Sequence, residues 1–206
     1  MMMAMSYRPP PPAIRVVLAH GASGTAASMR PYVEGLRARG VDAHAIDIPK
    51  RKAEDAVPAY LAAIAALPPA APGARLVIGG HSYGGRVASL LAADAGAGSG
   101  IATVARTLPA LAGLICFSYP LHRPGVPELG LRTEHWTRIA VPTLILEGEA
   151  DPFARLELLR AAMPLLARGR LVTFARQGHG LTRVLDAALD AVVAWFGATV
   201  VDRPGD

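Results

Sequence analysis

The chain has 206 residues, of which 52% are hydrophobic and 18% charged, so it is neither disordered nor long enough for two comfortable domains. Its formal net charge is +5, and its isoelectric point is near 9.9. The arginines are scattered and the one tight basic run, Lys50–Lys52, reads as a solvated loop, so we expect no nucleic-acid partner.

Short β-rich runs alternate with Ala- and Leu-rich helical patterns along the chain. Six strands are predicted, over Ile14–Leu18, Asp42–Ile46, Arg75–Ile78, Leu114–Phe117, Thr143–Leu146 and Leu171–Phe174. Helices are predicted over Ser28–Arg39, Glu54–Leu67, Ser82–Ala93, Phe153–Met163 and Leu181–Phe196. The strands lack polar alternation and are separated by helices, which indicates an α/β fold: a three-layer α/β/α sandwich around a mostly parallel sheet.

The organisation predicted for the chain is a single domain over residues 13–200. An extended proline-rich lead-in occupies residues 1–12, and a frayed tail follows from residue 201 to 206. The glycines at 96, 98 and 100 predict a flexible exit from the third helix. No apolar run has the length of a membrane span, and we expect no membrane partner.

The strongest motif is Gly80-His81-Ser82-Tyr83-Gly84, which lies between a predicted strand and a predicted helix. This strand–turn–helix context is the one that a G-x-S-x-G nucleophile motif requires. We expect Ser82 in a strained backbone conformation that exposes its hydroxyl. The alternative is a glycine-rich turn in a nucleotide-binding domain, with Ser82 as the helix N-cap. Neither the dinucleotide fingerprint nor the phosphate-loop motif is present to support that alternative.

A serine nucleophile needs an imidazole base and a carboxylate that orients it, and both are expected after later strands. Asp151 follows the fifth strand, and His179 stands between glycines after the sixth. We predict Asp151 as the acid and His179 as the base, with Glu147 and Glu149 as reserve acids. Read alone, the segment favours Asp151 as an ordinary helix N-cap, with Pro152 at the first helical position.

The other histidines are interpreted as structural or surface residues. His44 lies within a strand pattern and His135 in a polar segment, while His81 merely precedes the nucleophile. His20 is expected to brace the loop after the first strand by hydrogen bonding. This loop normally supplies one backbone N–H to an oxyanion hole, and we predict Ala22 as that donor and Tyr83 as the other.

Three residues after strand ends are candidates for the substrate pocket: Tyr119, His122 and Arg123. Ordinary loop packing is an equally good interpretation of each. An arginine at this position would face an acidic substrate.

With these residues placed, the chain resembles the α/β-hydrolase superfamily over nearly its whole length. A narrower likeness is to the small, lid-less, dienelactone-hydrolase-related family, which includes hydrolase-like domains of a testis-expressed protein and of a chromatin-complex subunit. Ser118 to His122 is its most distinctive signature. The segments that carry the likeness are Leu18–Ala22, Gly79–Arg86, Gly113–His122 and Leu146–Asp151.

The resemblance implies a minimal hydrolase fold without the two leading strands of larger relatives and without a cap domain. It also implies a serine hydrolase of small esters or thioesters that forms an acyl-enzyme, with no metal or organic cofactor. Two alternatives stay open: acyl transfer or thioester hydrolysis on the same triad, and an interaction module with negligible turnover. The expected partner is a small-molecule ester, and both a monomer and a homodimer are compatible with the sequence.

The chain contains a single cysteine, Cys116, within an apolar run. It cannot form an intramolecular disulfide, and we expect a buried, inert thiol. This pattern favours a reducing, cytoplasmic setting.

Overall fold

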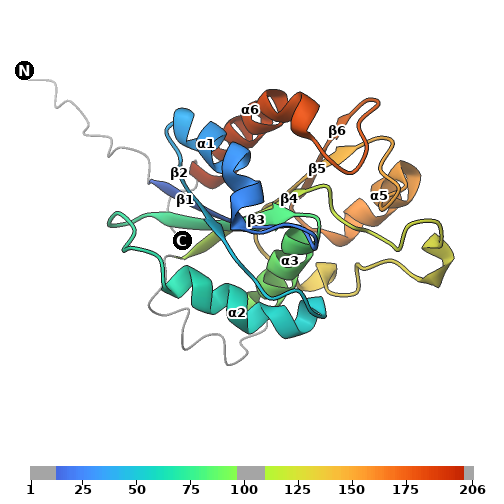
Figure 1. Ribbon diagram of the computed structural model, residues 1–206, viewed down its shortest axis with the longest axis horizontal. Coiled ribbons are helices and arrows are strands. Elements are labelled where there is room, and N and C mark those ends of the chain that lie inside the picture. Colours follow the sequence, from blue (N-terminus) through green and yellow to red (C-terminus); the bar gives the residue numbers. More distant parts are fainter. Residues whose placement is uncertain (1–12, 97–109, 202–206) are drawn as a thin grey trace, which may run out of the picture.

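The structure is a computed structural model that describes residues 13–96 and 110–201. Within these ranges six strands form one sheet in the order β2-β1-β3-β4-β5-β6, and every neighbouring pair is parallel (Figure 1). The predicted α/β sandwich is confirmed, although several strands extend beyond their predicted ends. Their bounds are β1 Ile14–Ala19, β2 Asp42–Ile46, β3 Arg75–His81, β4 Leu111–Phe117, β5 Thr143–Gly148 and β6 Gly169–Phe174.

The helices are α1 Arg30–Ala38, α2 Ala53–Ala65, α3 Tyr83–Gly96, α5 Leu156–Ala162 and α6 Leu185–Phe196. Short 3-10 turns, Ala26–Met29 and Thr182–Val184, occupy the predicted beginnings of α1 and α6. The helix predicted from Phe153 begins only at Leu156, because Asp151 holds residues 151–155 in a non-helical turn. No helix in the described ranges is long and apolar enough to cross a membrane.

Three of the predicted terminal and loop features fall largely outside the described residues. These are the lead-in over 1–12, the glycines at 98 and 100, and most of the tail over 201–206. The described part of the chain ends with a π-helical turn over Gly197–Val201.

Helices cover both faces of the sheet, and each face has its own apolar core. Alternate residues of β1 point to opposite sides, so Val16 and Leu18 belong to the core that includes α1 and α6, while Val17 and Ala19 belong to the core that includes α2, α3 and α5. Figure 1 shows α1 and α6 together on one side of the sheet and α2 and α3 on the other. Because the strands are buried on both faces, their sequences are almost continuously apolar.

The strand order reverses beside β1. The chain runs from β1 outward to β2 and then crosses back to β3 on the other side of β1. In open parallel sheets, such a reversal leaves a crevice at the carboxyl ends of the two central strands. Residues that follow β1 and β3 therefore meet at this edge.

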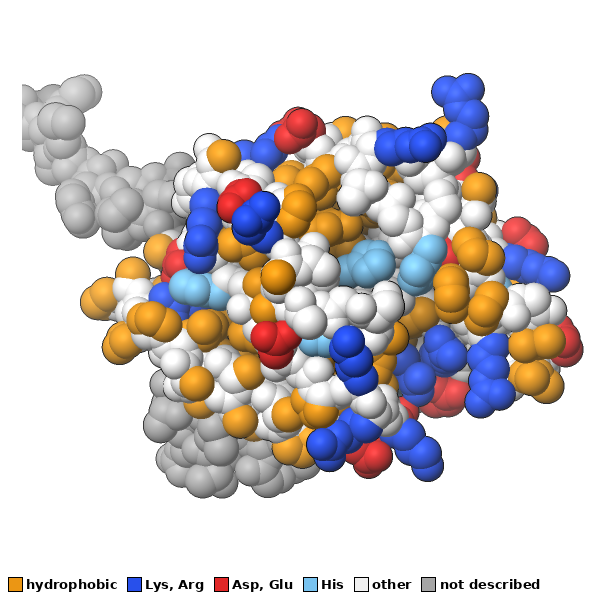
Figure 2. All heavy atoms as spheres, viewed as in Figure 1, with side chains coloured by type: hydrophobic (Ala, Val, Ile, Leu, Met, Phe, Trp, Pro, Cys, Tyr) orange, Lys and Arg blue, Asp and Glu red, His pale blue; other side chains and the backbone are white. Residues whose placement is uncertain are grey.

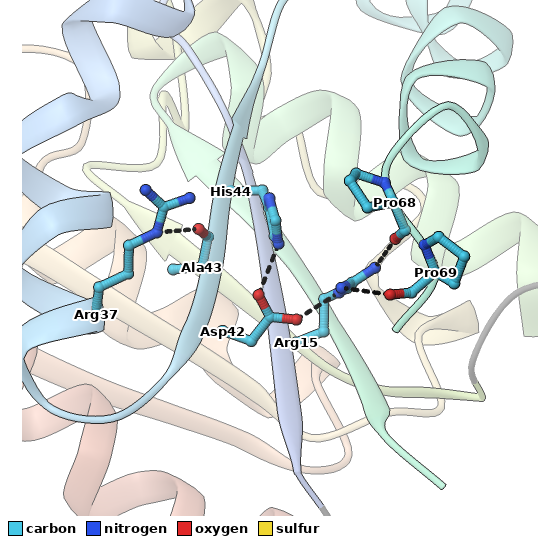
Figure 3. Close-up of polar contacts among 7 residues, drawn as sticks. All are labelled: Arg15, Arg37, Asp42, Ala43, His44, Pro68 and Pro69. Atoms are coloured by element: carbon cyan, nitrogen blue, oxygen red, sulfur yellow. Dashed lines mark hydrogen bonds and ion pairs between the residues drawn. The ribbon is translucent and has the colours of Figure 1, made fainter. Parts of the chain in front are cut away.

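Polar contacts join neighbouring elements at the amino-terminal ends of the strands, opposite the crevice (Figure 3). Arg15 at the start of β1 is only 7% exposed and forms a 2.7 Å ion pair with Asp42 of β2. Its other guanidinium nitrogens donate to the carbonyl oxygens of Pro68 and Pro69. Arg15 thus links β1, β2 and the loop before β3. These contacts lie at the end of the strands that is opposite the crevice.

Two glycines allow the first turn of α3 to lie against the end of β1. A Cβ atom on Gly80 or on Gly84 would stand 2.3 Å from the carbonyl oxygen of Ala19, so only residues without a side chain permit this approach. The contact places the N-terminus of α3 beside the carboxyl end of β1.

A buried serine–histidine contact joins α3 to the loop after β4. The Ser89 hydroxyl donates to the Arg86 carbonyl at 2.7 Å and lies 2.8 Å from Nε2 of His135, whose N–H it therefore accepts. Burial, and then the charge of Arg86, lowers the pKa of His135 to about 4.

Replacing Gly84 by alanine is expected to destabilise the protein, although alanine is the better helix former by about 1 kcal/mol. The added methyl group would meet the backbone of β1 rather than a movable side chain. We expect a loss of about 1–3 kcal/mol in the free energy of unfolding, measured by urea denaturation. Gly197→Ala is the matched control, since nothing lies within 4 Å of a Cβ there. Equal stabilities of the two variants would contradict the close contact.

His135 is expected to make the protein less stable in mild acid. Between pH 6.5 and about 4 the unfolded chain binds a proton that the folded imidazole does not, so stability falls as the pH falls through this window. His135→Gln keeps an N–H donor for Ser89 but cannot titrate. Urea denaturation across this window should show a smaller loss of stability for the variant than for the wild type. Identical pH slopes would show that the imidazole is not kept neutral by the fold.

Candidate active site

Ser82 occupies the turn between β3 and α3. Its φ of +51° lies in the left-handed region, as expected for a strained nucleophile turn. The backbone N–H of Ser82 donates to the carbonyl of Phe117 at 2.9 Å, which ties the turn to the end of β4. The turn is therefore fixed from both neighbouring strands.

His179 lies between Ser82 and Asp151 and hydrogen-bonds to both. Its Nε2 is 2.7 Å from the Ser82 Oγ, and its Nδ1 is 2.7 Å from Oδ2 of Asp151. A carboxylate only accepts, so Nδ1 carries the proton and Nε2 is free to accept the serine proton. Three loops, after β3, β5 and β6, supply these side chains, and the structure brings all three predicted residues together.

The Asp151 carboxylate is buried, being 4% exposed, and both of its oxygens are used. Oδ1 accepts the backbone N–H of Phe153 at 2.7 Å, and Oδ2 faces His179. Burial alone would raise the pKa of Asp151, but the hydrogen bonds from His179 and from the Phe153 amide outweigh it and hold this pKa below its usual value. The carboxylate therefore stays ionised. Its N-cap interpretation is wrong, because Arg155, which makes no side-chain capping hydrogen bond, occupies the N-cap position of α5.

The two reserve acids do not contact His179. Glu149 is exposed and accepts a hydrogen bond from Thr173. Glu147 is fully buried, and burial followed by the neighbouring charge of Asp151 raises its pKa well above the usual value. Of the two buried carboxyl groups, Asp151 thus carries the charge and Glu147 is neutral.

Two further residues hold His179 and were not predicted to belong to the site. His81 donates from Nε2 to the backbone carbonyl of His179 at 2.9 Å, and Phe153 places its ring 4.3 Å from the imidazole. Both are sequence neighbours of predicted site residues, His81 of Ser82 and Phe153 of Asp151. Only this adjacency could have indicated them, since His81 occupies the variable position of the G-x-S-x-G motif and Phe153 lies in no motif.

The loop after β1 approaches the same turn. A reverse turn, closed by the Gly24 N–H on the Gly21 carbonyl at 2.9 Å, carries Ala22, which lines one cavity with Ser82 and Tyr83. As expected, His20 braces this loop: its Nδ1 donates to the Gly21 carbonyl, and its Nε2 accepts the N–H of Ile48.

The cavity beside Ser82 has a volume of about 310 Å³. Its wall is strongly cationic: its charged residues are Arg51, Lys52, Glu54, Arg86 and Arg132. The side chain of Tyr83 fixes one rim, donating from its hydroxyl to the Pro49 carbonyl and accepting the N–H of Arg51. No inserted cap domain covers the cavity among the described residues.

None of the three predicted pocket residues lines the cavity beside Ser82, and two of them are buried. Tyr119 is fully buried, donates to the Arg132 carbonyl and packs edge-on against Trp136. His122 is 1% exposed, with Nδ1 donating to the Arg123 carbonyl and Nε2 accepting the N–H of Arg155. Both side chains turn inward because they hold the long loop after β4 to the core, so the structure corrects these expectations in favour of loop packing.

Arg123 does not line the cavity beside Ser82 either. It lines a neighbouring cavity of about 430 Å³, which also contains Arg86 and Arg132. The cationic residues that line the cavity with Ser82 therefore do not include Arg123, the one that was predicted.

The buried Ser89–His135 contact is not a second site of the same kind. The two residues are 1% and 4% exposed, and no carboxylate hydrogen-bonds to His135 in the described ranges. Ser82, in contrast, opens on a cavity and belongs to a three-residue chain of hydrogen bonds. That chain can remove a proton from Ser82 as its oxygen attacks a carbonyl carbon. In the described ranges, no three His, Cys, Asp or Glu side chains cluster closely enough to hold a metal ion.

Solved structures share this fold at low sequence identity. A monoacylglycerol lipase from Paleococcus ferrophilus is 17% identical over 89% of this chain and 94% of its own, with a TM-score of 0.68. A dienelactone hydrolase from Anabaena variabilis is 19% identical over 92% and 88% of the two chains, with a TM-score of 0.66. Est1E from Butyrivibrio proteoclasticus, solved with ferulic acid, is 17% identical over 91% and 89%, with a TM-score of 0.69.

At the level of sequence, a comparison with curated proteins gave no match. A family model described as the alpha/beta hydrolase domain matches residues 12–188. The narrower likeness to the dienelactone-hydrolase-related family stays a prediction. With most of its length matched, the chain belongs to the alpha/beta hydrolase family.

Proposed function

We propose that this protein is a serine hydrolase that cleaves esters or thioesters of small acyl groups with Ser82, His179 and Asp151. The observation that carries the proposal is the pair of 2.7 Å hydrogen bonds that link the serine hydroxyl to the imidazole and the imidazole to the buried carboxylate. The strained φ of Ser82 and the cavity beside it support the same function.

In the proposed mechanism His179 takes the Ser82 proton while the serine oxygen attacks the substrate carbonyl carbon. The backbone N–H groups of Ala22 and Tyr83 stabilise the oxyanion, and the N-terminus of α3 adds its partial positive charge. The carbon–oxygen or carbon–sulfur bond then breaks, and the leaving group receives the proton from the imidazolium. Water attacks the acyl-enzyme, with His179 again accepting a proton, and Ser82 is released.

Asp151 keeps His179 in the reactive tautomer and stabilises the imidazolium that forms. Glu147, being neutral, adds no second negative charge beside it. His81 and Phe153 are positioning residues, because they contact the backbone and the ring of His179 rather than the reacting atoms.

The named relatives support the reaction class. The solved structures that share this fold include a lipase, a dienelactone hydrolase and several esterases, all of which by name act on esters. The cavity beside Ser82, about 310 Å³, is at the small end of ligand sites, which favours a short acyl group. Acyl transfer would use the same residues with an alcohol or amine in place of water.

We also propose a reducing, cytoplasmic setting and a small-molecule partner. Cys116 is 1% exposed, its Sγ lies 3.7 Å from the Gly85 carbonyl, and burial raises the pKa of this thiol. Such a thiol is inert and gives no reason for an oxidising compartment.

Ser82→Ala is expected to abolish labelling by a fluorophosphonate probe and to lower the turnover of p-nitrophenyl butyrate by about 10⁴-fold or more, because the nucleophile is lost. Ser89→Ala is the matched control: this serine also contacts a histidine but is buried, so its removal should leave the labelling intact. Labelling and turnover are read by gel fluorescence and absorbance. A wild-type protein that shows neither would favour the interaction-module alternative.

Asp151→Asn is expected to reduce kcat by about 10⁴-fold while leaving the protein folded. The asparagine amide donates to Nδ1, which forces the proton onto Nε2, where it blocks acceptance from Ser82. Steady-state kinetics with the same ester, together with thermal denaturation, checks this expectation. Glu149→Gln removes an exposed carboxylate from the same loop and should keep wild-type kcat; a similar loss in both variants would mean that general loop charge, not tautomer control, matters.

A further inference from the structure

The cavity beside Ser82 has an excess of positive charge. Arg51, Lys52, Arg86 and Arg132 line it, and Glu54 is its single acidic residue, which leaves three unbalanced cations. Figure 2 shows Lys and Arg side chains gathered at the lower right of this face, over the N-terminal end of α2 and the loop that follows β4. Pale-blue histidine side chains lie above them, near the middle of the same face.

Neighbouring groups neutralise only one of these four cations. Arg86 gives one nitrogen to Glu54 at 2.7 Å, but its Nε is buried and has no hydrogen-bond acceptor in the described part of the chain. Arg132 donates to the Pro120 carbonyl at 3.1 Å, and no ion pair is found for it within the described ranges. Burial, and then repulsion by Arg86, lowers the pKa of Arg132.

The adjacent cavity extends the same arrangement. Arg86 and Arg132 line both cavities, and the second adds Arg123 together with Glu134, one charge of each sign. The second cavity therefore adds no net charge, and Arg132, which has no ion pair in the described ranges, lies where the two cavities meet. Keeping like charges together in a half-buried site is unfavourable for the empty protein, and a bound anion relieves this repulsion.

We propose that the substrate hydrolysed at Ser82 carries a phosphate group, which Arg86 and Arg132 bind while Arg51 and Lys52 complete its neutralisation. This inference rests on the proposed function, because it names the substrate class of the same site. Hydrolysis breaks only the acyl C–O or C–S bond; the phosphate stays on the released alcohol or thiol.

The size of the charge excess favours phosphate over carboxylate. A phosphate monoester carries about −1.5 to −2 near pH 7, and its oxygens match the fork of an arginine. A carboxylate carries a single charge and would leave two cations unbalanced. In a cavity of about 310 Å³ that also contains Ser82, the phosphate must lie close to the scissile bond, as it does in a short acylated glycerol phosphate.

The test compares substrates that differ only in phosphate. One pair is 1-butyrylglycerol 3-phosphate and 1-butyrylglycerol, followed by titration of the released acid. The other is S-butyryl-3-mercaptopropyl phosphate and S-butyryl-3-mercaptopropanol, followed by thiol release. We expect kcat/KM to be at least about ten times higher for the phosphate-bearing member of one pair, and the pair that shows this preference distinguishes a phosphorylated alcohol from a phosphorylated thiol as the leaving group. This preference should weaken as salt is added.

Arg132→Gln and Arg86→Gln should each reduce the phosphate-to-neutral ratio of kcat/KM toward one. Arg160→Gln is the control, since this exposed arginine on α5 lines neither cavity and should leave the ratio unchanged. Competitive inhibition of p-nitrophenyl butyrate hydrolysis by glycerol 3-phosphate, but not by glycerol, gives a second measurement on the wild-type protein.

The outcomes separate this inference from the proposed function. If Ser82-dependent turnover of neutral esters is found with no phosphate preference, the inference fails and the hydrolase function stands. An equal or stronger preference for 3-butyrylglycerate, in which a carboxylate replaces the phosphate, also overturns the inference. Absence of both turnover and fluorophosphonate labelling removes the two together.

Discussion

Gly80 and Gly84 let the first turn of α3 lie against the carbonyl of Ala19, where a Cβ atom would stand only 2.3 Å away. This contact holds Ser82 in a left-handed conformation at the carboxyl edge of the sheet. It also brings the N-terminus of α3 beside the loop after β1, so that the proposed nucleophile and the proposed oxyanion donors share one crevice. The loops after β5 and β6 then place Asp151 and His179 beside Ser82, whose position is already fixed.

Those two side chains are kept reactive by an unequal pair of carboxyl groups. Asp151 and Glu147 are both buried near the end of β5, yet hydrogen bonds lower the pKa of Asp151 and burial raises that of Glu147. A single negative charge results, and it faces Nδ1 of His179. Contacts from His81 and Phe153 then restrict the histidine, so its Nε2 stays directed at Ser82.

The residues that line the cavity beside Ser82 differ from those that the sequence predicts. Tyr119 and His122 follow a strand end and looked accessible, but both turn inward because the loop after β4 needs internal hydrogen bonds and apolar contacts. Conversely, Arg86 lies in the first turn of α3 and Arg132 ends a loop, and neither was predicted to line the cavity beside Ser82. Their positive charges lie together because α2, α3 and the loop after β4 all line the cavity beside Ser82.

The sequence by itself determined the alternation of strands and helices, the parallel sheet, and the order of Ser82, Asp151 and His179, because apolar periodicity and glycine-framed turns are local signals. It could not determine which side of a loop faces the core, where α5 begins, or that Ser89 and His135 pair in the interior. Those outcomes depend on contacts between residues far apart in the chain. Tertiary structure alone decided the pKa difference between Glu147 and Asp151 and the cationic wall of the cavity, since both arise from burial and from charges on separate elements.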